Sequence, residues 1–177
     1  GASAGITGVT ASAKWLNTGV AQTVFSTSSR HCGVYETQRN TSSFQPQLQC
    51  GDTSATLWGM GNGSLASTQG YAAGTGNSSS VTRTSTGTAH HIGNSTSATS
   101  ADLWLNGANK VTAAHSAPTP VAVTLAVFAA NRPTVPSFYG DCRLTFYHIG
   151  TGLTDTQVAA LSARLNTLMA GFGCNTY

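Results

Sequence analysis

The segment from Val121 to Phe172 constrains the fold most, because two kinds of hydrophobic periodicity follow each other there. In residues 121–130 bulky apolar side chains recur at every second position, which is the spacing of a strand with one face in a core. A strand formed by residues 142–149 would carry apolar side chains on both of its faces. We therefore expect a second strand that is covered on each side, and a helix that supplies one of the covers.

The sequence Thr154-Asp-Thr-Gln157 predicts where that helix begins, since it has the pattern of a capping box. Apolar residues then follow at steps of three and four, as on one face of a helix: Val158, Leu161, Leu165, Leu168 and Phe172. Gly171 and Gly173 are helix-stop signals. We predict one amphipathic helix at about residues 154–172, packed on a sheet.

The rest of the chain consists of short strand candidates separated by turns. The Asn106-Gly107 pair predicts a tight hairpin. Pro46 favours an edge strand or loop for residues 44–50, and residues 70–80 are typical of a loop. About ten short strands with one late helix predict an all-β fold: a two-sheet antiparallel jelly-roll sandwich, formed by residues 1–177 as a single domain. Residues 1–10 could be a linker from a larger chain.

Composition excludes several classes of protein. Charged residues make up 7% of the chain, against about 25% in ordinary soluble domains, whereas hydrophobic residues reach 40%, as in a folded protein. The eight Lys and Arg residues are scattered, so we predict no nucleic-acid binding. No apolar run approaches the roughly 18–20 residues of a membrane span. Nor does a signal-peptide pattern start at Gly1, so we expect any export to follow processing of a longer chain, a signal-free route or cell lysis.

The four cysteines lack the CxxC spacing of a metal site. An even number in a chain with few charges and many hydroxyl groups favours disulfides and an oxidising exterior. Of the three possible connectivities we favour Cys32–Cys50 with Cys142–Cys174, because the second bond would tether the tail beyond the helix to the strand beneath it. Four free thiols are the alternative.

Six segments occur in an order that is typical of one family. They are Trp15-Leu-Asn-Thr-Gly19, Gly33-Val-Tyr35, His91-Ile-Gly-Asn94, Leu103-Trp-Leu-Asn-Gly107, Phe128-Ala-Ala-Asn-Arg132 and Phe146-Tyr-His-Ile-Gly-Thr-Gly-Leu-Thr-Asp155. From about Gly5 to Phe172 the chain resembles the concanavalin A-like (laminin-G-like) lectin and glucanase jelly-roll modules of phage virion proteins, such as tail fibres and head appendages, and of bacterial surface proteins. The resemblance implies a two-sheet sandwich that binds glycans or surfaces in a virion or cell envelope. It supplies no catalytic residues.

The same superfamily includes glycosidases and polysaccharide lyases. Glycosidases need two carboxyl groups that flank the scissile bond. Asp155 already caps the helix, the Glu-x-Asp-x-x-Glu signature of laminarinase-like relatives is absent, and any pair would come from Glu36, Asp52, Asp102 and Asp141. A lyase site would draw on His90, His91, Tyr71 and Arg83, but their spacing does not require them to meet. We predict no enzymatic activity.

Calcium is the usual cofactor of laminin-G and legume-lectin relatives, and it binds where acidic side chains cluster. This chain has five acidic residues, so we predict no cofactor and no metal. A single weak calcium site at Asp52 or Asp102 with loop carbonyls is the alternative.

A carbohydrate site in a sandwich would combine an aromatic platform with amide, hydroxyl or cationic donors. The candidates in strand-end and loop positions are Trp58, Asn62, Tyr71, Arg83, His90, Asn94 and Trp104. Each aromatic ring could instead belong to the core.

We therefore predict a non-catalytic virion or cell-surface module, extracellular in location, that binds a glycan or a host receptor. Its other expected partners are virion or envelope subunits, including two more copies of itself in a homotrimer. A purely structural domain for capsid decoration or fibre assembly is the first alternative. A polysaccharide hydrolase or lyase is the second.

Overall fold

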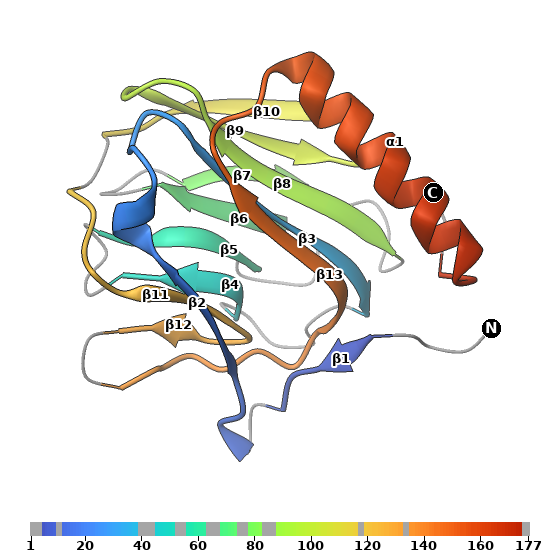
Figure 1. Cartoon of the computed structure of the whole chain (residues 1–177), viewed down its shortest axis with the longest axis horizontal. Coiled ribbons are helices and arrows are strands. Elements are labelled where there is room, and N and C mark those ends of the chain that lie inside the picture. Colours follow the sequence, from blue (N-terminus) through green and yellow to red (C-terminus); the bar gives the residue numbers. More distant parts are fainter. Residues whose placement is uncertain are drawn as a thin grey trace.

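Alternating apolar side chains place one face of most strands into a core between two sheets (Figure 1). The computed structural model describes residues 5–9, 12–38, 45–51, 56–62, 68–73, 78–82, 88–116, 119–132 and 135–174. Two mainly antiparallel sheets and one C-terminal helix confirm the predicted jelly-roll sandwich.

The first sheet contains six strands in the order β1 (Ile6–Thr7), β13 (Arg143–Gly150), β3 (Arg30–Gln38), β8 (Ala89–Ser95), β9 (Ser100–Leu105) and β10 (Asn109–Ala114). The second sheet contains β2 (Leu16–Ala21), β11 (Thr124–Val127), β4 (Pro46–Cys50), β5 (Trp58–Asn62), β6 (Thr68–Ala73) and β7 (Ser78–Thr82) in that order. A seventh strand, β12 (Ala130–Asn131), pairs in parallel with β4. One short 3-10 helix, η2 (Gln22–Val24), follows β2.

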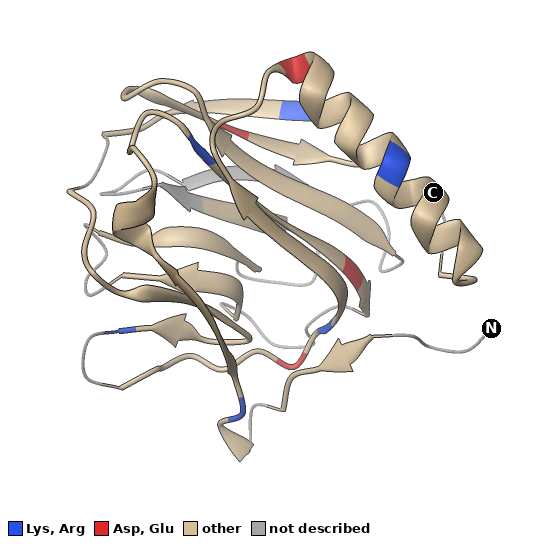
Figure 2. Cartoon of the chain, in the orientation of Figure 1, with Lys and Arg blue, Asp and Glu red and all other residues tan. Residues whose placement is uncertain are grey.

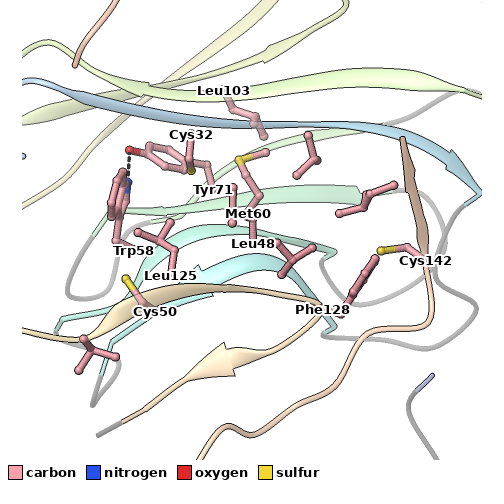
Figure 3. Close-up of a cluster of buried hydrophobic side chains, with 14 of the residues drawn as sticks. Cys32, Leu48, Cys50, Trp58, Met60, Tyr71, Leu103, Leu125, Phe128 and Cys142 are labelled. Carbon is pink, nitrogen blue, oxygen red and sulfur yellow. Dashed lines mark hydrogen bonds between the residues drawn. The ribbon is translucent and has the colours of Figure 1, made fainter. Parts of the chain in front are cut away.

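The core between the sheets depends on a close fit of large and small residues (Figure 3). Leu48 and Met60 of the second sheet and Leu103 of the first sheet are fully buried there. Gly93 on β8 faces the ring of Tyr71 on β6, and a Cβ atom at Gly93 would overlap that ring. The two sheets approach this closely because position 93 has no side chain.

Helix α1 (Asp155–Gly171) confirms the predicted helix, including its capping box. The Thr154 hydroxyl accepts a hydrogen bond from the Gln157 backbone N–H, and the Gln157 side chain accepts one from the Thr154 backbone N–H. The helix covers the outer face of the six-stranded sheet, which makes this sheet apolar on both sides (Figure 1).

The predicted apolar stripe of this helix is partly wrong. Its buried residues are Val158, Ser162, Leu165 and Met169. Leu168 and Phe172 are exposed instead. The buried residues are spaced by four, three and four positions, which keeps them on one face of a helix with 3.6 residues per turn. The predicted stripe begins with a step of three, so by the last turn its residues lie on the flank of the helix.

The hairpin prediction is confirmed, since β9 and β10 pair antiparallel through a turn in which Asn106 and Gly107 have φ values of 56° and 71°. The edge-strand prediction for Pro46 is wrong, because β4 lies between β11 and β5. Pro46 is tolerated there as the first residue of the strand, next to a shift in register.

Two further sequence predictions need correction. Residues 70–80 are not one loop, because β6 continues to Ala73 and β7 begins at Ser78. Within the expected linker 1–10, Ile6 and Thr7 pair with β13 in the six-stranded sheet. No helix in the described part of the chain is long and apolar enough to cross a membrane.

The contact between Gly93 and Tyr71 can be tested by substitution. We expect Gly93→Ala to lower the free energy of unfolding by about 1–3 kcal/mol, because the added methyl group overpacks the interface between the sheets. Gly171→Ala is the matched control, since a Cβ atom at Gly171 meets nothing within 4 Å. Urea unfolding of both variants measures the difference, and equal stabilities would contradict this account of the core.

Candidate functional site

Two of the predicted platform rings, Trp58 and Tyr71, lie in the core. Both are fully buried, and the Trp58 indole N–H donates a hydrogen bond to the Tyr71 hydroxyl oxygen at 3.0 Å (Figure 3). The Tyr71 hydroxyl also meets the hydroxyl of Ser95 at 3.1 Å, and the Arg30 guanidinium lies 4.8 Å from the Trp58 ring centre. Burial raises the pKa of Tyr71 to about 12. These rings connect the two sheets and offer no face to a ligand.

The third ring, Trp104, lies beneath helix α1. It packs with Ile92 and Val158 and is 6% exposed. The Lys110 ammonium group lies 5.1 Å from its ring centre. The prediction that Trp58, Tyr71 and Trp104 form an exposed aromatic platform is therefore wrong, because both sheets and the helix cover them.

The polar candidates also hold the fold together. The Asn94 side chain donates to the Leu153 carbonyl oxygen at 2.8 Å and accepts from the Leu153 backbone N–H at 2.9 Å, which fixes the approach to the helix. His90 is fully buried and its ring nitrogen Nδ1 lies 3.0 Å from the Ser162 hydroxyl of α1. Asn62 ends β5, but its side chain and the whole of Arg83 lie outside what the structure describes.

The cysteines are all free and buried, which corrects both predicted disulfides, Cys32–Cys50 and Cys142–Cys174. Cys142 belongs to the core between the sheets, while Cys174 packs with Tyr35 and Met169 on the other side of the six-stranded sheet. A strand therefore separates the two sulfur atoms that the sequence suggested as partners.

We expect Cys32, Cys50 and Cys142 of the native protein not to react readily with thiol reagents at pH 8. Burial raises the pKa of Cys50 to about 12 and raises the pKa values of Cys32 and Cys142 as well, so the reactive thiolate is scarce. A colourimetric thiol reagent should give four equivalents in urea without reductant. Fewer than four in urea would show that a disulfide had formed.

Two of the described carboxylates, Asp102 and Asp155, share Lys110 as their partner. Its ammonium group is 3.2 Å from Asp102 and 3.1 Å from Asp155. Glu36 is fully buried 3.7 Å from the His91 ring nitrogen Nε2. Charged residues are few and spread over the fold (Figure 2). The Lys110 ion pairs tie the helix to the sheet, and the Glu36–His91 pair lies inside the protein. Neither arrangement has the open geometry of the two carboxyl groups of a glycosidase.

Metal binding finds no support in the described ranges. No group of three or more His, Cys, Asp or Glu residues there is placed to hold an ion. Of the two alternatives for calcium, Asp102 accepts a hydrogen bond from Thr112 at 2.6 Å and pairs with Lys110, while Asp52 lies outside the described residues.

The exposed aromatic residues are ones that the sequence analysis did not select. Phe138 is 60% exposed, and its neighbours on the surface include the half-buried Arg132, whose guanidinium carbon lies 5.2 Å from the ring centre. Within the described part of the chain this guanidinium meets no carboxylate and makes no hydrogen bond. An aromatic residue in a proline-rich loop was the sequence signal that could have identified this pair.

The backbone at Phe138 is strained. Its φ is 55°, a left-handed conformation that costs a residue with a side chain roughly 1–2 kcal/mol. Two hydrogen bonds between Ala130 and Ser137 hold the loop on one side of it, and a bond from the Gly140 N–H to the Phe128 carbonyl oxygen holds the other. Hydrogen bonds therefore tie the backbone to its neighbours on both sides of the ring.

No family model and no curated protein sequence matches the chain. The fold, however, is similar to several solved structures. The Ruminococcus gnavus IT-sialidase CBM40 aligns with a TM-score of 0.60 at 11% identity, over 79% of this chain and 85% of that one. Domain 4 of AbnA, a GH43 extracellular arabinanase from Geobacillus stearothermophilus, solved in complex with arabinotriose, aligns with a TM-score of 0.54 at 14% identity, over 81% and 70%.

Domains LG4-5 of the mouse laminin alpha1 chain align with a TM-score of 0.50 at 14% identity, over 84% of this chain and 40% of that one. Identities this low carry information on the fold alone. The chain has the concanavalin A-like, laminin-G-like jelly-roll fold.

Proposed function

We propose that this chain is a non-catalytic glycan-binding module and that Phe138 and Arg132 make the contact with the sugar. The observation that carries the proposal is a solvent-exposed aromatic ring on a strained backbone, beside a guanidinium that has no carboxylate or hydrogen-bond partner among the described residues. The similarity to a CBM40 and to an arabinotriose-bound domain supports the ligand class.

Burial of the ring does not offset the strain at Phe138. Phe128 has a φ of 66°, but it is 2% exposed, so burial of its ring offsets the cost. Phe138 leaves most of its surface in water and gains little from burial. Strained residues of this kind persist at binding sites, because there the position of the side chain matters more than its contribution to stability.

The chemistry of the pair suits a sugar ring. An aromatic face packs against the apolar C–H surface of a pyranose or furanose, as rings do in other small-molecule sites. The guanidinium carries five N–H donors and no acceptor, so it can donate to hydroxyl or carboxylate oxygens at the edge of the sugar. Since Asp102 and Asp155 pair with Lys110 and Glu36 is buried beside His91, binding rather than bond cleavage is the function that the site supports.

A virion or cell-surface location belongs to this proposal, as does recognition of a host receptor. A low charge and a surface rich in Ser and Thr are compatible with an exposed assembly. A scaffold domain for capsid decoration or fibre assembly, including a homotrimer, is the alternative that the following experiment separates.

Phe138→Asn is the decisive variant. Asparagine tolerates the left-handed conformation, so we expect the free energy of unfolding to stay equal or to rise by up to about 1 kcal/mol. Glycan-array binding, with arabinotriose as one probe, should fall at least about tenfold, because the ring is lost. Arg132→Ala should weaken binding by a similar factor.

Phe172→Ala is the matched control, since Phe172 is 62% exposed at the end of helix α1 and lies outside the pair. It should bind as the wild type does. Unchanged binding by Phe138→Asn would refute the assignment of the site. A wild-type protein that binds no saccharide at millimolar concentration would refute the function and favour the scaffold.

A further inference from the structure

Three histidine rings lie in a row on the outer face of the six-stranded sheet. His31 on β3, His148 on β13 and His90 on β8 are successive members, with ring centres 5.1 Å and 5.2 Å apart. These strands are neighbours in the sheet, in the order β13, β3 and β8. The proposed glycan contact does not involve any of them.

Glycines make room for the row. In the register of β13 and β3, His148 lies opposite Gly33 and Gly150 lies opposite His31. A Cβ atom at Gly33 would overlap the His148 ring, and one at Gly150 would come within 2.6 Å of the His31 ring. Each ring therefore lies flat across the neighbouring strand, and the sequence places a glycine at both positions where this is required.

A hydrogen bond joins two members of the row. The Nε2 atoms of His90 and His148 are 2.9 Å apart, so one of them must donate and the other must accept. Exactly one proton fits between them. The Nδ1 atom of His148 is buried and has no hydrogen-bond partner in the described part of the chain, so a second proton on that ring would be a buried donor without a partner there.

The row is connected to helix α1 at two points. The Nδ1 atom of His90 lies 3.0 Å from the hydroxyl of Ser162, which is a buried residue of the helix. The Nδ1 atom of His31 contacts the carbonyl oxygen of Thr151, in the segment that leads into the helix. The hydrogen-bonding state of the imidazoles thus acts directly on the docking of the helix.

Within the described ranges, no carboxylate pairs with an imidazole of the row. The Tyr35 ring stacks on His90 from β3, and Phe146 of β13 lies beside His148. The charges that act on His90 are those of His148, of His91 and of His31. Of the four described acids, Asp102 of β9 and Asp155 of α1 pair with Lys110, Glu36 of β3 lies near His91, and Asp141 precedes β13.

We propose that the three histidines form an acid-operated latch: the neutral row holds helix α1 on the sheet, and protonation breaks the shared-proton contact and releases the helix. Release would expose the apolar face formed by Ile92, Trp104 and Tyr35, which the helix now covers.

The direction of the pH effect follows from the burial of the row. Burial, together with the neighbouring imidazoles, holds the pKa of His90 well below 6.5; burial lowers the pKa of His148 to about 3 and also lowers that of His31. The unfolded chain therefore binds protons that the folded row does not. The stabilising effect of the row is complete above pH 6.5 and is lost as the pH falls from 6.5 toward 3. At pH 4.5, each histidine that stays neutral in the folded protein raises the equilibrium constant for unfolding by about a hundredfold.

Hydrogen exchange of the intact chain at pH 7.5 and pH 4.5 tests the latch. After correction for the intrinsic effect of pH, we expect the amides of helix α1 to open at least about tenfold more at pH 4.5. Amides of the second-sheet strands β4 and β5 should show a smaller change, which separates release of the helix from global unfolding.

Three variants complete the test. His148→Phe keeps a ring over Gly33 but removes the proton site, so the acid response of the helix should fall at least about threefold. Ser162→Ala should open the helix already at pH 7.5. His115→Gln is the matched control, because His115 is a buried histidine outside the row, and it should respond as the wild type does.

Equal opening of the helix at both pH values in the wild type would overturn the proposal, as would a full response in His148→Phe. If His148→Phe does not fold, NMR titration of the wild-type imidazoles replaces it. The latch requires all three row histidines to titrate below pH 6, and a midpoint near 6.5 for any of them would contradict it.

Discussion

The approach of Tyr71 to Gly93 sets the distance between the two sheets, and the rest of the structure depends on it. With the sheets this close, the Tyr71 hydroxyl of one sheet reaches the Ser95 hydroxyl of the other, and the Arg30 guanidinium reaches the indole of Trp58. A wider separation would break these two contacts between the sheets, and the loss of polar contacts in an apolar interior is unfavourable. The core is thus defined by one missing side chain as much as by the large residues around it.

The outer face of the six-stranded sheet repeats the same arrangement with histidines in place of tyrosine. Gly33 and Gly150 allow the rings of His148 and His31 to lie flat on the sheet, and the helix closes over their neighbour His90. This face therefore combines apolar packing, which is indifferent to pH, with imidazoles, which are not.

The aromatic residues that are buried and those that are exposed differ from the ones that the sequence suggested. The tryptophans and tyrosine that looked most suitable for a sugar are structural, whereas Phe138 pays a conformational penalty and stays in water. A position that is strained and exposed is poor for stability and good for presentation of a ring. The candidate binding site therefore lies in the loop after β12 rather than at the strand ends.

The sequence by itself determined the fold class, helix α1 with its capping box and the Asn106-Gly107 hairpin, because these features depend on local periodicity and turn chemistry. It could not determine the sheet order that buries β4, nor which rings are covered, because burial depends on strands and a helix that are remote in the chain. The predicted site residues failed for this reason: Trp58, Tyr71 and Trp104 are apolar enough for either environment. Only the tertiary structure brought His31, His90 and His148 into one row and placed Arg132 over Phe138, since contacts between distant residues arise from register and packing rather than from spacing.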